Sequence, residues 1–184
     1  IDMPVGPTAK VRSDAAAESL TGRLGGTAAA LGLRLAVQRS DGRQPVGRGI
    51  GPALEARDVL QVLRGDAAAP QDLRERAIAL AGELLDLVPG NVVGRGRVLA
   101  RETLLSGQAL RKFLAICEAQ GGYTEPPQAA FHAPVEAVRT GVVASVDNRR
   151  LAKVAKLAGA PTAAAAGVDT DTRIGDRVER GQPL

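Results

Sequence analysis

The sequence predicts an α/β fold that is rich in helix and has few strands, followed by a small α+β module of barrel-like or hammerhead type. Three observations favour this fold class. Apolar residues alternate over residues 33–37, as in a strand. Several later segments repeat Leu and Ala at helical spacing. Glycine and proline then replace the helical pattern after residue 120, which predicts an α/β part at 1–120, a linker at 121–134 and a module at 135–184.

The first part begins with a short apolar segment at residues 1–6, which is predicted to be a buried strand. A helix with an apolar stripe follows and is stopped by Gly32, and residues 33–37 form the next predicted strand. Further helices are expected at 52–64, 70–87, 95–105 and 108–120, because glycine or proline separates these periodic segments. Strand, helix, strand and then several helices is typical of part of an α/β domain.

Residues 44–58, with the sequence QPVGRGIGPALEARD, are the most distinctive stretch. Three alternating glycines lead into a helix that is predicted to begin at Pro52, where proline suits the first helical position. Glycine allows a backbone to approach a ligand closely or to adopt positive φ. Such a loop at a helix N-terminus can hold an ion or a phosphate. Spacing alone favours an ordinary connection to a well-capped helix.

The composition narrows the classes of function. Aromatic residues make up only 2% of the chain and the net charge is +4 without a dense basic run, so nucleic-acid binding is not expected. One cysteine and one histidine allow neither an intrachain disulfide nor a zinc site. No apolar run reaches the length of a membrane span, and a cytoplasmic protein without a membrane partner is expected.

The second module offers few candidates for chemistry. It contains one predicted helix at 148–157, whose four basic residues are expected to form a solvated face. Residues 175–184 have the turn-and-strand pattern of biotinyl/lipoyl-type barrels but no carrier lysine, so a structural role is expected. Asp169 and Asp171 are predicted to be turn acids rather than a general acid–base pair. His132 lies in the predicted linker, which argues against a catalytic triad.

Five segments, in order along the chain, resemble the C-terminal half of the pyrimidine nucleoside phosphorylases. The sequence is most similar to the long-form, thymidine phosphorylase-like branch, which is related to the archaeal AMP phosphorylases. On this resemblance, residues 1–120 correspond to the C-terminal part of the α/β catalytic domain. The matching segments are IDMPVGPTAKV at 1–11, QPVGRGIGPALEARD at 44–58, LAICEAQGG at 114–122, VDNR at 146–149 and GDRVERGQPL at 175–184.

The resemblance implies phosphorolysis by a pentosyltransferase of nucleoside salvage. Thymidine and phosphate would give thymine and 2-deoxyribose 1-phosphate, with inorganic phosphate as co-substrate and no organic cofactor. The full-length protein would be a homodimer. AMP or another nucleoside monophosphate is the alternative substrate, and a non-catalytic binding or scaffold module is the alternative of another class.

The resemblance also implies which parts of the active site this chain contains. The family's phosphate loop, base contacts and proton donor precede the matching region, so the chain is expected to be a piece of a longer protein, cut at both ends. It would contain no main catalytic residue and would be inactive alone.

Two binding positions would remain. A potassium ion is implied at the carbonyl groups of Val46 and Gly49 and the carboxylate of Asp58, where potassium-dependent members carry Glu; the alternative for Asp58 is a solvated helix acid. Lys10 corresponds to a position that lines the base pocket. Next to Thr8, as in the AMP branch, this lysine either meets a nucleotide phosphate or lies on the surface after a strand.

Overall fold

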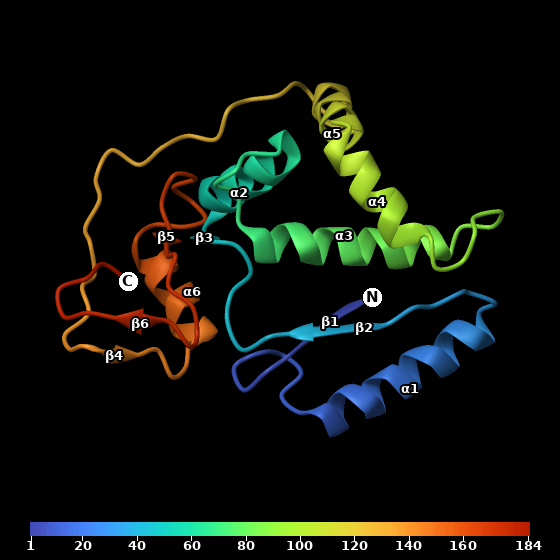
Figure 1. Cartoon of the computed structure of the whole chain (residues 1–184), viewed down its shortest axis with the longest axis horizontal. Coiled ribbons are helices and arrows are strands. Elements are labelled where there is room, and N and C mark those ends of the chain that lie inside the picture. The colour runs from blue at the N-terminus through green and yellow to red at the C-terminus, as the bar shows by residue number, and fades with distance from the viewer. The chain divides into compact units, whose positions relative to one another are not determined.

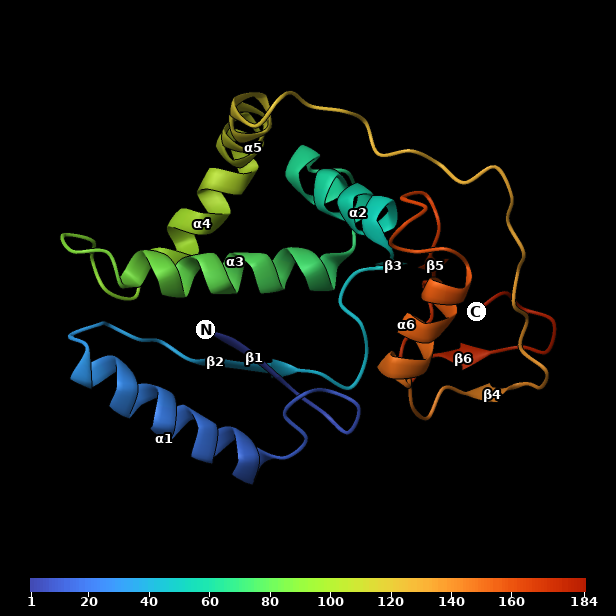
Figure 2. The same cartoon turned by 180° about the vertical axis from the view of Figure 1, so that it is seen from behind.

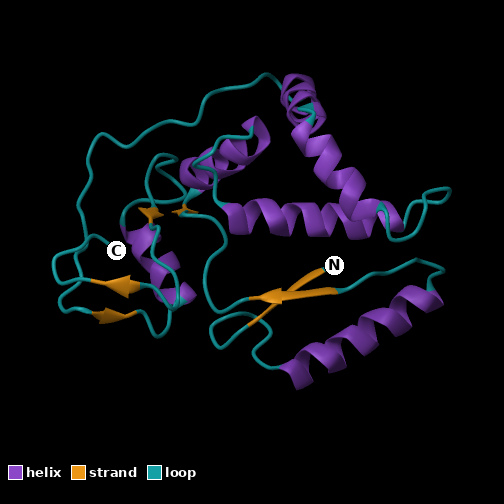
Figure 3. Cartoon of the chain, in the orientation of Figure 1, coloured by secondary structure: helices purple, strands orange, loops and turns teal.

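The computed structural model describes residues 1–184, which form two compact units. Unit 1 comprises Ile1–Gly42 and Leu60–Tyr123, and unit 2 comprises Arg43–Val59 and Thr124–Leu184. Figure 1 labels the helices and strands, and Figure 3 shows that helices far outweigh the short strands. The predicted helix-rich α/β class with few strands is therefore confirmed.

Unit 1 is built on a parallel pair of strands joined by a helix. Strand β1 (Asp2–Val5) pairs with β2 (Gln38–Asp41), and α1 (Asp14–Ala30) connects them and contacts β1. Helix α1 begins where the Ser13 side chain accepts the N–H of Ala16 at 3.2 Å. Met3 and Ala17 are buried, so the core of this unit begins between the helix and the strand pair.

The strand predicted at residues 33–37 is wrong. These residues form neither helix nor strand, and β2 begins only at Gln38. The register of the pair places Asp2 opposite Gln38, so residues 33–37 extend beyond the end of the ladder. Leu33 is 62% exposed, and the alternation of apolar residues was not a sign of a buried face.

The predicted helices of residues 52–120 are confirmed to within a residue at each end. They are α2 (Pro52–Arg64), α3 (Gln71–Asp86), α4 (Gly96–Leu105) and α5 (Gln108–Ala119). Helices α3 and α4 meet in both views of Figures 1 and 2. They approach so closely that a Cβ atom on Gly96 would lie 2.1 Å from the carbonyl oxygen of Gly82. None of the helices combines the length and the apolar character needed to cross a membrane.

An ion pair joins α3 to β1. The Asp2 carboxylate accepts a hydrogen bond from Ser40 Oγ at 2.6 Å and another from Arg76 Nε at 3.0 Å. Partial burial raises the pKa of Asp2, but the hydrogen bonds from Ser40 and Arg76 and the charge of Arg76 outweigh it, so the pKa lies below the ordinary value of 3.8. The pair thus links helix and strand through a carboxylate that stays ionised.

Unit 2 contains two antiparallel strand pairs, the first two turns of α2 and one further helix. Strand β3 (Gly49–Ile50) pairs with β5 (Val168–Asp169), and β4 (Gly141–Val142) pairs with β6 (Arg177–Val178). Helix α6 (Asn148–Leu157) contacts β3 and β5 and has the predicted bounds, because the Asp147 carboxylate caps its N-terminus. Residues 121–134 contain no helix or strand. Their role as a domain linker, and the barrel-like form of 135–184, stay predictions.

Candidate functional site

The glycine loop at residues 44–51 folds back against the first turn of α2. A Cβ atom on Gly49 would lie 2.5 Å from the main-chain carbonyl carbon of Leu54, so only glycine allows this approach. Gly51 has a φ of 144°, and its N–H donates to Glu55 Oε1 at 3.0 Å. Glycine is thus required here at a close approach and at positive φ, and the group that Gly49 approaches is the protein's own helix.

Asp58 holds this loop from the second turn of α2. Its Oδ2 atom accepts the main-chain N–H of Arg48 at 2.6 Å and that of Gly49 at 2.8 Å. The residue is only 6% exposed and is the one charged residue in the chain that is buried. Hydrogen bonds of this kind are stronger than those between neutral groups, and they are worth more when water is excluded. Asp58 is therefore a buried anchor of the loop and not a solvated helix acid.

The residues that follow β5 hold the other side of the loop. The Arg48 carbonyl accepts the N–H of Thr170 at 3.1 Å, which continues the β3–β5 ladder by one residue. The N–H of Gly49, opposite Asp169 in the ladder, bonds to Asp58 instead of to β5. Further along, the N–H of Ile174 donates to Gln44 Oε1 at 2.8 Å.

Four charged residues surround the loop, and we call them the Asp58 cluster: Arg48, Asp58, Asp171 and Arg173. Arg48 Nε lies 3.7 Å from Asp58 Oδ1 and 3.5 Å from Asp171 Oδ1. Arg173 Nη2 donates to the Gly47 carbonyl at 2.7 Å. Two guanidinium groups and two carboxylates thus occupy the surroundings of a loop that the sequence marked as a candidate ion site.

The structure brings part of the predicted ion site together. Gly49 and Asp58 are in direct contact, and half-buried Val46 belongs to the same loop. Lys10 belongs to unit 1, where it lies exposed in the loop after β1. The roles of all four residues in binding a cation or a substrate stay predictions.

Two residues of the cluster were missed by the sequence argument. Arg48 lies within the distinctive stretch but was given no role, Arg173 lies outside every quoted segment, and only the fold shows that both side chains act on the same loop. The prediction that Asp169 and Asp171 are turn acids is wrong for Asp169, which ends β5 opposite Gly49. Asp171 lies just beyond the strand, exposed, with its carboxylate toward Arg48.

The residues of the loop offer oxygen donors to a monovalent cation, but the Arg48 guanidinium competes with such an ion for Asp58. Carbonyl and carboxylate oxygens suit such an ion. One oxygen of Asp58, however, already accepts two N–H groups, and the other faces the Arg48 guanidinium. A cation at Asp58 would have to share the carboxylate with that guanidinium, so the donor set fits the ion only in part.

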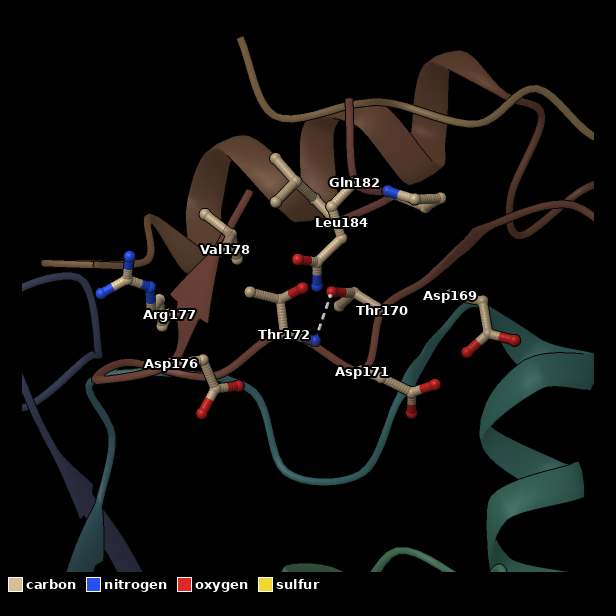
Figure 4. Close-up of a pocket in the computed structure, with 10 residues that line it drawn as sticks. Asp169, Thr170, Asp171, Thr172, Asp176, Arg177, Val178, Gln182 and Leu184 are labelled. Atoms are coloured by element: carbon tan, nitrogen blue, oxygen red, sulfur yellow. Dashed lines mark hydrogen bonds between the residues drawn. The ribbon is translucent and has the colours of Figure 1, made fainter. Parts of the chain in front are cut away.

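A cavity of about 680 Å³ in unit 2 is lined by the end of β5 and by residues that follow it. Figure 4 shows its lining, in which Asp169, Asp171 and Asp176 lie apart from one another and the N–H of Thr172 bonds to Thr170 Oγ1. Arg177 is the one basic residue of the lining. Asp171 therefore borders both this cavity and the Asp58 cluster. The lining comprises residues 169–172, 176–178 and 182–184.

Comparison with known proteins gives a consistent family assignment. No protein-family model matches the chain. It is 59% identical to the "Putative thymidine phosphorylase" of Polaromonas sp. (strain JS666), 58% identical to "Putative thymidine phosphorylase 1" of Acidovorax sp. (strain JS42) and 55% identical to the "Putative thymidine phosphorylase" of Tolumonas auensis. Each match covers all 184 residues of this chain and 36% of the relative. Over its whole length, this chain is a segment of a thymidine phosphorylase-like protein.

Proposed function

We propose that the full-length protein is a pentosyltransferase that phosphorolyses thymidine. The observation that carries the proposal is the identity of 54–59% with proteins named "Putative thymidine phosphorylase", in alignments that cover the whole chain. The five segments that resemble pyrimidine nucleoside phosphorylases support the same assignment. Because the chain spans 36% of these relatives, the activity belongs to the proposal for the whole protein.

The proposed reaction exchanges one bond at the anomeric carbon of the sugar. The C1′–N1 bond of thymidine breaks and a C1′–O bond to phosphate forms, which gives 2-deoxyribose 1-phosphate. The base leaves with the bonding electron pair and takes up a proton. Nucleoside and phosphate are both substrates, and the protein is proposed to act as a homodimer.

The role proposed for this segment is to support the site rather than to break bonds. The loop at 44–51 is fixed on three sides, by the first turn of α2, by Asp58 and by the residues after β5. A loop held in this way is a rigid support for groups supplied by the rest of the protein. Residues 135–184 are proposed to complete a barrel-like module around the two strand pairs of unit 2.

The substrate is tested by assaying the full-length protein with thymidine, uridine and AMP, each with and without phosphate. Thymine release that depends on phosphate is the expected result. Release of adenine from AMP without reaction of thymidine would replace the first choice by the alternative, a nucleoside monophosphate phosphorylase. Lys10 would then be the residue to change, since its exposed ammonium group beside Thr8 is suited to a nucleotide phosphate.

A scaffold or binding module is the alternative of another class. The apolar side chains that α4 and α5 leave exposed, among them Leu105 and Ile116, favour it because such surfaces bind other proteins. A full-length protein that binds neither phosphate nor nucleoside in calorimetry, and releases no base from any nucleoside, would support the scaffold and end the phosphorylase proposal.

The resemblance also carries the proposal of a potassium ion at Val46, Gly49 and Asp58. Its support is the position of Gly49, whose main-chain N–H bonds to the Asp58 carboxylate, so that two of the three implied ligand residues are in contact. The guanidinium of Arg48 competes with it for the same charge. The ion and the guanidinium are thus two ways to neutralise one buried carboxylate, and the choice between them can be measured.

A further inference from the structure

Arg48 connects three parts of unit 2. Its main-chain N–H donates to Asp58 on α2, and its carbonyl accepts from Thr170 after β5. Its side chain, 23% exposed, places Nε within ion-pair distance of both Asp58 and Asp171. One residue therefore ties the glycine loop to the helix on one side and to the segment after β5 on the other.

A second guanidinium, that of Arg173, donates hydrogen bonds to carbonyl groups of the same region. Arg173 donates from Nη2 to Gly47 at 2.7 Å and from Nη1 to Thr170 and Thr172 at 3.2 Å and 3.3 Å. Carbonyl oxygens that converge in a loop attract cations, and a guanidinium supplies both the charge and the N–H donors that they need. The loop carbonyl of Gly47 is thus already bonded to a cationic side chain.

The charges of the Asp58 cluster balance within the chain. The Arg48 guanidinium faces both carboxylates, the Arg173 guanidinium bonds to main-chain carbonyls, and the buried carboxylate is the one with the most partners. An added monovalent cation at Asp58 would meet the like charge of Arg48, which lies 3.7 Å from the same carboxylate. Cation and guanidinium therefore compete for this carboxylate.

We propose that Arg48 is a built-in cation that positions the glycine loop, so that the loop keeps its shape without a bound metal ion. Arg48 is a positioning residue: it acts through Asp58 and Asp171 and needs no contact with substrate. The inference concerns the loop alone and goes beyond the proposed thymidine phosphorolysis.

Removing Arg48 should have an effect that removing an ordinary structural residue would not have. Removing the guanidinium leaves the Asp58 carboxylate with two N–H partners but without a counter-charge. A small monovalent cation then fits where a guanidinium stood, so the Arg48→Ala variant should become potassium-responsive although the unaltered protein is not.

The experiment compares the full-length protein with three variants in potassium chloride and in tetramethylammonium chloride at equal ionic strength. The variants are Arg48→Ala, the charge-conserving Arg48→Lys, and Lys153→Ala as a matched control that removes an exposed positive charge from α6. The melting temperature is measured in each salt, and thallium(I), a monovalent ion close to potassium in size, is titrated with detection by its NMR signal.

The unaltered protein, Arg48→Lys and Lys153→Ala should each melt at one temperature in both salts and bind no thallium(I). Arg48→Ala should melt lower in tetramethylammonium and recover by roughly 2–4 °C in potassium, and it should bind thallium(I). An unaltered protein that is itself stabilised by potassium, or an Arg48→Ala variant without recovery, would overturn the proposal. Melting and thallium(I) binding need no nucleoside, so neither result depends on whether thymidine is a substrate.

Discussion

The carboxylate of Asp58 accepts the main-chain N–H of Gly49 at 2.8 Å inside a region that is closed to water. A side chain from the second turn of a helix thereby fixes the loop that leads into the same helix. The loop and the helix consequently form one unit of structure, and the stability of the loop should follow the chemistry of this carboxylate.

Replacing Asp58 by alanine should lower the free energy of unfolding by roughly 2–4 kcal/mol, because a buried N–H group, a partly buried N–H group and a guanidinium lose their acceptor. Asp58→Asn should cost less, since its amide oxygen still accepts a hydrogen bond. Urea denaturation of the full-length protein measures both variants. Asp66→Ala is the control, because Asp66 is an exposed acid that follows α2. Equal effects of Asp58→Ala and Asp66→Ala would contradict the anchoring role.

Alanine substitutions at two glycines should change the stability of the protein in opposite directions. Gly49→Ala would place a Cβ atom 2.5 Å from the backbone of Leu54, so we expect a loss of about 1–3 kcal/mol in stability. Gly26 is an exposed residue of α1, and a Cβ atom added there would have no neighbour within 4 Å. Gly26→Ala should therefore add about 0.5–1 kcal/mol to the stability. Thermal melting of both variants tests the pair, and a neutral Gly49→Ala would show that the loop can move away from α2.

The ion pair between Asp2 and Arg76 should make stability depend on pH. The pKa of Asp2 is lowered in the folded chain, so its contribution is complete above the ordinary value of 3.8 and is lost as the pH falls through the lower folded value. Asp2→Asn should therefore lower stability near neutral pH and flatten the stability profile below about pH 4.

Denaturation by urea at a series of pH values measures this profile. Arg76→Gln removes the same ion pair from the side of α3, and it should flatten the profile in the same way. Parallel profiles for Asp2→Asn and the unaltered protein would mean that Asp2 is not the group responsible.

Local signals in the sequence were enough to place the helices. Pro52 and Gly65, with its φ of 74°, bracket α2, and the Asp147 cap sets the start of α6. The strands were harder because their position depends on a partner. Residues 33–37 alternate as a strand should, yet the ladder formed at Gln38 because β1 sets the register.

The candidate site was predictable only on one side. Residues 44–58 carry the glycines, the proline and the acid that shape the loop, and the sequence singled them out. Its other side is supplied by Arg173, which is 126 residues away from Gly47 along the chain. Strands of two residues, such as β3 and β5, leave too weak a pattern to reveal that pairing.

The division of the chain into units has a consequence for how this protein can be taken apart. Unit 2 consists of Arg43–Val59 together with Thr124–Leu184, whereas the chain between them belongs to unit 1. A single cut at residues 121–134 would remove β5 and Arg173 from the loop that they hold. Residues 124–184 therefore cannot be grafted onto another protein alone. Residues 43–59 would have to be added as a second, separately encoded piece.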